Sequence, residues 1–259
     1  WRDTIGTAKP EPVPEGLHYD LWMGPAPEKP FTQNRYHYNW HWQWDYGNGD
    51  MGNQGVHEVD VARLGLGVKL PTKVSAMGGH FMFDDDQETP NTLMAVFEFP
   101  NPAGSGDKKK MMEFEVRHWI TDNGGLMMES GEGSTSYMTS SKNTVGNTFY
   151  GSKGYMVKTV DKWKTFMGRE KEPGETGEGL GNHYKNFTDA VRANDRSNLN
   201  APIEEGVYSC ALIHLANISY RVGRTLYFDP ERMRIKGDEE ANSMLTKEYR
   251  EPYVVPEKV

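Results

Sequence analysis

Three polar side chains at helical spacing are the clearest candidates for chemistry in this sequence. Asn53 and His57 are four residues apart, and Asp60 follows three residues later. On a helix, this spacing aligns an amide, an imidazole and a carboxylate along one face. A neutral imidazole, whose ordinary pKa is about 6.5, is suited to accept an alcohol proton, and a carboxylate one turn away could fix its tautomer. The segment indicates a general base, although a histidine beside an aspartate on a helix is also typical of a structural pair.

An aromatic segment, residues 36–46, directly precedes this stretch. Within it His37, His41 and Asp45 are four residues apart, so on a helix they could form a metal face. The density of aromatic rings and the weak helical pattern argue against that, and no metal is expected. Two interpretations stay open: ordinary core packing, or a wall on which a substrate stacks. The candidate residues of such a wall are Tyr38, Trp40, His41, Trp42, Trp44 and Asp45.

Two further features could contact ligands. His183 follows a loop rich in glycine and glutamate, expected over residues 168–181, and is a candidate substrate contact. The acidic run 84–88 offers oxygen atoms that suit calcium. It lacks the glycine and the ligand spacing of an EF-hand loop, so we expect a solvated polar rim there.

The composition argues against several classes of function. A net charge of −8 and the absence of a basic stripe are untypical of proteins that bind nucleic acid. No apolar run approaches the roughly 20 residues of a membrane span, so no membrane partner is expected. The single cysteine, Cys210, lies in an apolar stretch and is expected to be a buried thiol. Whether the protein is cytoplasmic or exported stays open.

The elements that must position these residues are predicted by composition and periodicity. A proline-rich, extended arm is expected over residues 1–35, an α+β domain over 36–230 and a charged tail over 231–259. A helix over residues 51–65 carries the candidate base. Asp50 is expected to cap the start of that helix.

The middle of the chain predicts strands without intervening helices. Apolar-rich or alternating runs separated by turn residues indicate strands at 73–83, 91–99, 111–120, 127–137, 147–150 and 154–160. Helices return at residues 184–192 and 203–222. Because consecutive strands imply hairpins, we expect an open, predominantly antiparallel β-sheet with helices on one face.

Several segments resemble a known family. Residues 47–67, GNGDMGNQGVHEVDVARLGLG, are similar to the GGG…D-x-G-x-H-x-x-D…G segment of the glucose–fructose oxidoreductase/inositol dehydrogenase (Gfo/Idh/MocA) family, where it opens the first helix of the C-terminal domain. The other segments look like those of a bacterial subgroup: HYDLWMGPAP (18–27), RYHYNWHWQWDYGNGD (35–50), GGHFMFDDDQETPNT (78–92), FYGSKGYM (149–156) and HLANISYRVGRTLYFDP (214–230).

The resemblance implies roles for the three polar residues. His57 falls on the family's catalytic histidine and Asn53 on its catalytic aspartate. Since asparagine cannot ionise, it cannot raise the basicity of His57, but an orienting or substrate-binding hydrogen bond remains possible. Asp60 matches the family's following aspartate, a structural partner. The resemblance also favours the substrate wall over core packing for the aromatic segment.

The resemblance implies half of an enzyme that uses NAD or NADP to move a hydride to or from a secondary alcohol of a sugar or polyol. The family's other half is a Rossmann domain with a glycine-rich phosphate loop and a catalytic lysine. Here no G-x-G-x-x-G follows a predicted strand, and the run from Gly174 to Gly179 sits among glutamates that would repel a pyrophosphate. We therefore expect this chain to bind no dinucleotide alone, to work with a missing N-terminal dinucleotide-binding domain and to form a homo-oligomer.

Two other functions remain open from the sequence. The first is a non-catalytic carbohydrate-binding or oligomerisation module of the same fold, without hydride transfer. The second is a metal-assisted hydrolase or lyase built on the histidine and aspartate cluster.

Overall fold

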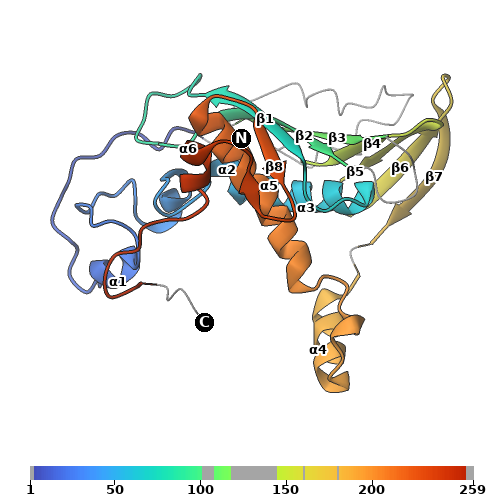
Figure 1. Cartoon of the computed structure of the whole chain (residues 1–259). Helices are drawn as coiled ribbons and strands as arrows, with labels where there is room; N and C mark the ends of the chain where they lie inside the picture. The colour runs from blue at the N-terminus through green and yellow to red at the C-terminus, as the bar shows by residue number, and fades with distance from the viewer. Residues whose placement is uncertain (1–2, 101–107, 118–144, 160, 180, 255–259) are drawn as a thin grey trace.

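The fold is seen in a computed structural model, which describes residues 3–100, 108–117, 145–159, 161–179 and 181–254. It is an α+β fold with two antiparallel sheets, a layer of helices and long irregular segments at both ends (Figure 1). The expected fold class, an open antiparallel sheet with helices on one face, is confirmed. The strand expected at 127–137 lies outside the described residues.

The first sheet holds the core of the molecule. Its strands are β1 (Lys73–Gly79), β2 (Thr92–Phe99), β3 (Lys110–Arg117), β8 (Leu226–Asp229) and β9 (Arg234–Ile235), in the order β3-β2-β1-β8-β9. Side chains alternate between faces along β2, so Leu93, Ala95, Phe97 and Phe99 all point inward and are fully buried. The burial pattern of β2 therefore shows which face of the sheet is the core.

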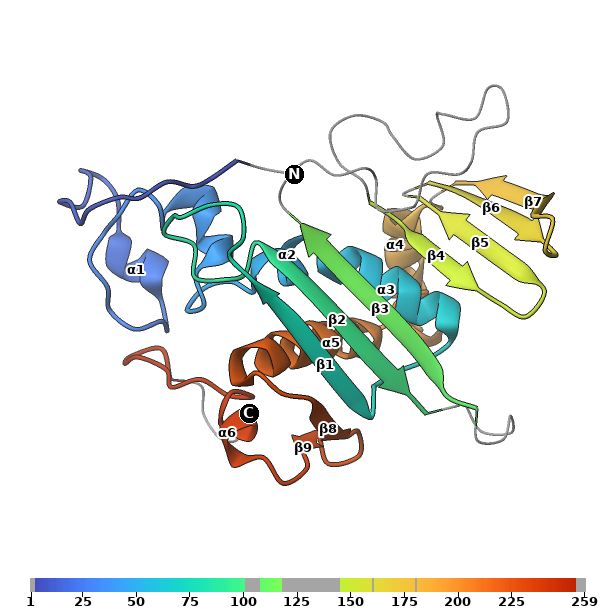
Figure 2. The same ribbon diagram turned by 90° about the horizontal axis from the view of Figure 1, so that it is seen from above.

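In the part of the chain that the structure describes, helices cover the inward face of this sheet. The main ones are α3 (Gly55–Leu66) and α5 (Ile203–Val222), and Figure 2 shows both lying beneath β1, β2 and β3. The helix predicted at 51–65 is present, but it is divided at Gln54 into α3 and a short α2 (Gly49–Asn53). Asp50 does not cap this helix. The N-cap of α2 is Asn48, and the Asn48 side chain makes no capping hydrogen bond.

A second antiparallel sheet lies beyond the first (Figure 2). It contains β4 (Asn147–Tyr150), β5 (Gly154–Lys158), β6 (Lys162–Met167) and β7 (Glu172–Glu178) in that order. The prediction of a loop at 168–181 was wrong, because β7 occupies most of these residues. Opposite charges pair across the strands at Lys162 and Glu178, and as an edge strand β7 tolerates Pro173.

The remaining elements are short or peripheral. In chain order they are α1 (Tyr19–Met23), the 3-10 helix η1 (His37–Trp42), α4 (His183–Ala193), the 3-10 helix η2 (Arg196–Asn198) and α6 (Glu239–Ser243). Cys210 lies on the outer side of α5 and is exposed, so the expectation of a buried thiol was wrong. No helix among the described residues combines the length and the apolar character of a membrane span.

The acidic run 84–88 anchors the N-terminal arm instead of forming a solvated rim. The carboxylate of Asp85 accepts hydrogen bonds from the hydroxyl of Thr4 and the backbone N–H of Ile5, both at 2.9 Å. Asp86 accepts from the backbone N–H of Ala8 at 2.7 Å and from Asn34 at 3.1 Å. These oxygen atoms therefore serve backbone and side-chain donors of the arm.

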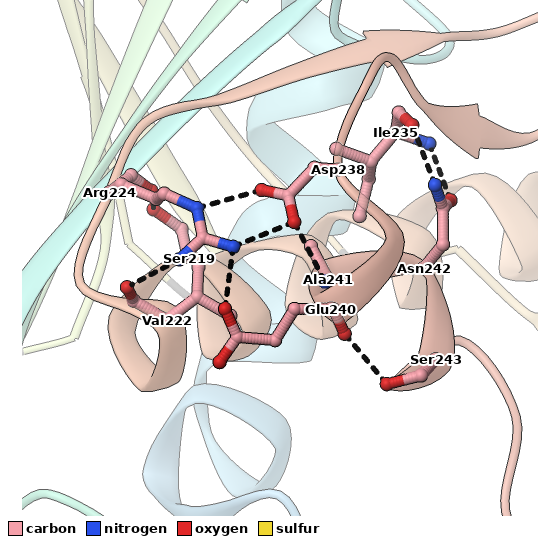
Figure 3. A network of polar contacts seen from close by, with 9 residues as sticks. All are labelled: Ser219, Val222, Arg224, Ile235, Asp238, Glu240, Ala241, Asn242 and Ser243. Carbon is pink, nitrogen blue, oxygen red and sulfur yellow. Dashed lines mark hydrogen bonds and ion pairs between the residues drawn. The ribbon is translucent and has the colours of Figure 1, made fainter.

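The C-terminal segment is fastened to the sheet by Arg224 (Figure 3). Its guanidinium donates to both carboxylate oxygens of Asp238, at 2.8 and 2.7 Å, and to Glu240 at 2.8 Å. Asn242 then brackets Ile235 by donating to its carbonyl and accepting from its N–H. A bidentate pair of this kind fixes orientation as well as distance.

Candidate functional site

Glycines bring the aromatic segment against the start of α2. A Cβ on Gly47 would stand 2.3 Å from the carbonyl oxygen of His41, so only glycine permits this close turn. Gly49 has a φ of +64° and packs against the side chain of Thr89. The turn from the aromatic segment into α2 is thus specified by these two glycines.

Asn53 and His57 lie on either side of the break at Gln54. His57 is exposed near the start of α3, and no hydrogen bond to its ring comes from any residue that the structure describes. Asn53 is partly buried, and its amide donates to the carboxylate of Asp50 at 3.4 Å. The imidazole is therefore accessible from outside this chain, and the amide is oriented by Asp50.

Asp50 is a site residue that the sequence alone did not reveal. Its side chain is buried, with 7% of its surface exposed, and it also accepts a hydrogen bond of 3.1 Å from the indole N–H of Trp42. Asp50 thereby couples the aromatic segment to Asn53. The only sequence signal was an aspartate at the helix start, which is equally typical of a cap.

Asp60 points away from His57. The hydroxyl of Ser209 on α5 donates to it at 2.5 Å, and the guanidinium of Arg63 lies 3.5 Å away. Arg63 is 3% exposed and also donates to Ser209 and to the carbonyl of Val68, each at 3.0 Å. Asp60 therefore ties α3 to α5, and no hydrogen bond joins it to the imidazole whose tautomer it could have fixed.

A carboxyl group beside His57 has an altered environment. Burial raises the pKa of Glu58, while the positive charge of Lys158 on β5 acts in the opposite direction. The Glu58 carbonyl accepts a hydrogen bond of 3.0 Å from Asn147 on β4. The second sheet therefore approaches the α3 turn that presents His57, a proximity that the sequence did not indicate.

The aromatic segment separates into exposed and buried members. Tyr38 is 60% exposed and Trp40 is 36% exposed, with Trp40 stacked on His41 at 3.8 Å between ring centroids. Trp42 is 1% exposed, so its indole belongs to the interior and offers no face to a ligand. The guanidinium of Arg221 covers the ring of Trp44 at 5.0 Å. The interpretation as a wall thus fits Tyr38 and Trp40, whereas core packing describes Trp42.

The other two candidate features, a metal face at residues 37–45 and a substrate contact at His183, do not add to the site around His57. Because residues 37–42 form a 3-10 helix, the spacing of His37, His41 and Asp45 does not place them on one α-helical face. No group of three His, Cys, Asp or Glu side chains in the described part of the chain could hold a metal ion. His183 opens α4, at the far end of α5 from the aromatic segment (Figure 1).

A pocket of about 410 Å³ lies beside the aromatic segment. Its walls come from three parts of the chain: the arm, the aromatic segment and the C-terminal tail. The lining residues are Trp22, Met23, Pro25, Ala26, Pro27, Trp40, Asp45, Tyr46, Lys247, Glu248 and Tyr249. Two of the predicted wall residues, Trp40 and Asp45, therefore face a pocket that the arm and tail complete.

Comparisons with solved structures find chains of similar topology at low identity. One is a putative NADPH-dependent oxidoreductase from Desulfitobacterium hafniense (13% identity, TM-score 0.49, covering 73% of this chain and 51% of that one). Another is an aldose-aldose oxidoreductase from Caulobacter crescentus complexed with glycerol (14%, 0.49, 73% and 50%). A third is the WlbA dehydrogenase from Bordetella pertussis in complex with NADH and UDP-GlcNAcA (16%, 0.41, 73% and 48%). The chain spans about half the length of each.

Comparison with sequence families identifies the family of this chain. No curated protein matches the chain. The family described as oxidoreductase family, C-terminal alpha/beta domain matches residues 2–84 and 170–255, which together make up more than half of the 259 residues. The matched residues include α2, α3 and α5, the elements that carry Asn53, His57 and their supporting contacts. The chain therefore belongs to the Gfo/Idh/MocA oxidoreductase family, as its C-terminal α/β domain.

Proposed function

We propose that this chain is the substrate-binding half of an NAD(P)-dependent oxidoreductase that moves a hydride to or from a secondary alcohol of a sugar or polyol. The observation that carries the proposal is the exposed imidazole of His57 beside Asn53, in a chain of this family. His57 would accept the alcohol proton during oxidation and return it during reduction. The nicotinamide would supply the hydride acceptor or donor.

The dinucleotide itself would be held elsewhere. Among the residues described here, the glycine run from Gly174 to Gly177 forms part of the edge strand β7, not a turn into a helix, and glutamates flank it. A pyrophosphate would be repelled there. The cofactor and the family's lysine would come from a separate dinucleotide-binding domain.

Asn53 would position the substrate instead of tuning the base. Its amide N–H is directed at the buried carboxylate of Asp50, which leaves the amide oxygen to accept a hydrogen bond from a substrate hydroxyl. A neutral amide cannot raise the basicity of His57 as a carboxylate could. The imidazole would therefore act with little help from this position.

The exposed members of the aromatic segment would contact the substrate. Tyr38 and Trp40 offer exposed rings, and aromatic rings suit the C–H faces of sugars. His41, stacked on Trp40, would support this contact. Trp44 and Asp45 would lie at the edge of this contact. His183 is a weaker candidate, because α4 lies at the other end of α5 (Figure 1).

The open face of the first sheet supports self-association. Its exposed side chains include Met77, Met94, Val96, Met111 and Tyr227. An apolar patch on a sheet is typical of an interface between copies. We propose a homo-oligomer formed through this face.

The proposed activity is tested in the enzyme formed by this chain and its dinucleotide-binding domain. Reduction of NAD and NADP is followed optically with a panel of sugars and polyols. Turnover of at least one neutral sugar or polyol is the expected result. Tight cofactor binding without turnover of any of them would overturn the proposal and favour the non-catalytic module.

A further inference from the structure

The pocket beside the aromatic segment is a second place where this chain could hold a ligand. Trp22 comes from the arm, Trp40 and Asp45 from the aromatic segment, and Lys247 and Tyr249 from the tail. None of its lining residues belongs to α3. The pocket is therefore a different part of the surface from the helix turn that presents His57.

The two ends of the chain are held together at this pocket by one arginine. The guanidinium of Arg250 donates to the carboxylate of Asp20 at 2.7 Å and to the carbonyls of Gly24 at 2.8 Å and Ala26 at 3.2 Å. Its backbone N–H donates to the carbonyl of Pro25 at 3.0 Å. In Figure 1 the tail accordingly runs beside α1. The contacts fix the tail across the arm, so the walls of the pocket are defined by specific bonds.

The aromatic walls are packed against their own neighbours. The ring of Trp22 lies 5.5 Å from Tyr19 and 4.9 Å from Tyr46, and Trp40 is stacked on His41. Rings that are already ordered lose little conformational freedom when a ligand binds. The negative π faces attract the weakly positive C–H groups on the apolar side of a sugar ring.

The polar groups of the pocket carry charges of both signs. Asp45 forms an ion pair with Lys29, and the ammonium of Lys247 donates to the carbonyls of Trp44 at 3.0 Å and Asp45 at 3.2 Å. Lys247 has three N–H groups, so one remains for a ligand. Glu248 adds an exposed carboxylate. Because the charges offset one another, neither an anion nor a cation gains a net attraction.

Tyr46 lines the pocket through its ring. Its hydroxyl is buried, so a ligand in the pocket would contact the ring and not the hydroxyl. Burial also raises the pKa of Tyr46 to about 12, so this part of the wall stays neutral.

We propose that this pocket binds a neutral, polyhydroxylated ring, with the ring face on the aromatic walls and its hydroxyls directed to Lys247 and Glu248. The inference rests on the proposed function only in treating Trp40 and Asp45 as ligand contacts. It requires neither a cofactor nor a catalytic role for His57.

The test uses the whole chain without cofactor. Methyl glucoside, methyl galactoside and methyl mannoside serve as neutral probes, glucuronate as the anion and glucosamine as the cation. Binding is measured by saturation-transfer NMR and by titration of tryptophan fluorescence. We expect at least one neutral glycoside to bind more tightly than both charged sugars.

Variants of Tyr249 localise that binding. Tyr249→Ala removes one wall and should weaken binding about tenfold, as loss of one stacked ring does. Tyr249→Phe keeps the ring and should bind within about twofold of the original chain. Tyr150→Ala is the matched control, because Tyr150 is an exposed tyrosine on β4, away from the pocket. Circular dichroism confirms that all three variants fold.

The outcomes separate this inference from the proposed function. It is overturned if no neutral glycoside binds, if a charged sugar binds more tightly, or if Tyr249→Ala weakens binding no more than Tyr150→Ala. Turnover of a sugar or polyol by the two-domain enzyme, with no pocket binding, would remove this inference alone. Pocket binding without any turnover would remove the dehydrogenase proposal alone.

Discussion

The indole N–H of Trp42 donates a hydrogen bond of 3.1 Å to the buried carboxylate of Asp50. This contact joins the aromatic segment to the helix turn that carries Asn53, since the amide of Asn53 donates to the same carboxylate. The candidate site is thus built on a polar contact inside the protein.

Removing the donor of Trp42 should destabilise the fold. Trp42→Phe deprives the Asp50 carboxylate of one hydrogen bond in a buried setting, so the free energy of unfolding should fall by about 1–3 kcal/mol. Urea denaturation measures it. Trp40→Phe is the control, because Trp40 is partly exposed, and it should change the stability by less than about 0.5 kcal/mol. Equal effects of the two substitutions would contradict a role for the Trp42–Asp50 contact.

Loss of the His57 imidazole should impair turnover of the enzyme that contains this chain and its dinucleotide-binding domain. His57→Ala should lower kcat by about 10²–10⁴-fold, the usual contribution of a general base. His183→Ala removes another exposed histidine, at the far end of α5, and should leave kcat within about twofold. Steady-state kinetics on both variants decide the matter. Near-normal turnover of His57→Ala, or an equal loss in His183→Ala, would show that the base lies elsewhere.

A charge on the open face of the first sheet should dissociate the oligomer. Met94 lies opposite Met77 in the register of β1 and β2, and both are exposed. Met94→Glu would bury unpaired charges between two copies, which is costly. Sedimentation at micromolar concentration should show at least a dimer for the original chain and a monomer for the variant. Met167→Glu, on the second sheet, is the control and should stay oligomeric, and a monomeric original chain would refute this interface.

The contact between Arg224 and Asp238 should make stability depend on pH. Hydrogen bonds from Arg224 lower the pKa of Asp238 below its ordinary value. A carboxylate with a lowered pKa in the folded state stabilises the fold above the pKa of the unfolded chain, and that contribution is lost as pH falls through the lowered value. The urea midpoint should therefore decline in acid by a smaller amount in Asp238→Asn than in the original chain.

The control for this pH dependence is Asp84→Asn, which removes an exposed carboxylate. It should keep the decline of the original chain. Because the guanidinium of Arg224 is exposed, the effect should shrink at high salt. An Asp238→Asn variant that loses as much stability in acid as the original chain would exclude this ion pair as the cause.

Several parts of the fold follow directly from local sequence. Helix α5 has the predicted bounds, because Pro202 precedes its first turn and Gly223 adopts the left-handed conformation that ends it. The strand predicted at 91–99 is observed as β2, because its apolar-rich run is bounded by turn residues. The glycines around Asn53 and His57, with the spacing of these two residues, are what made the family resemblance visible in the sequence. Each of these signals concerns residues only a few positions apart.

The pairing of distant segments was decided by the tertiary structure. Strand β7 has a glycine- and glutamate-rich sequence without apolar alternation, and it becomes a strand because β6 offers it hydrogen bonds and an opposite charge. In the sequence, Asp85 and Asp86 are typical of a solvated acidic run. In the folded chain, their carboxylates accept hydrogen bonds from backbone N–H groups of the arm. The Trp22–Tyr249 pocket likewise joins residues from the two ends of the chain. Local periodicity indicates which side chains tend to be buried. Which distant residues bury them or form hydrogen bonds with them depends on the tertiary fold.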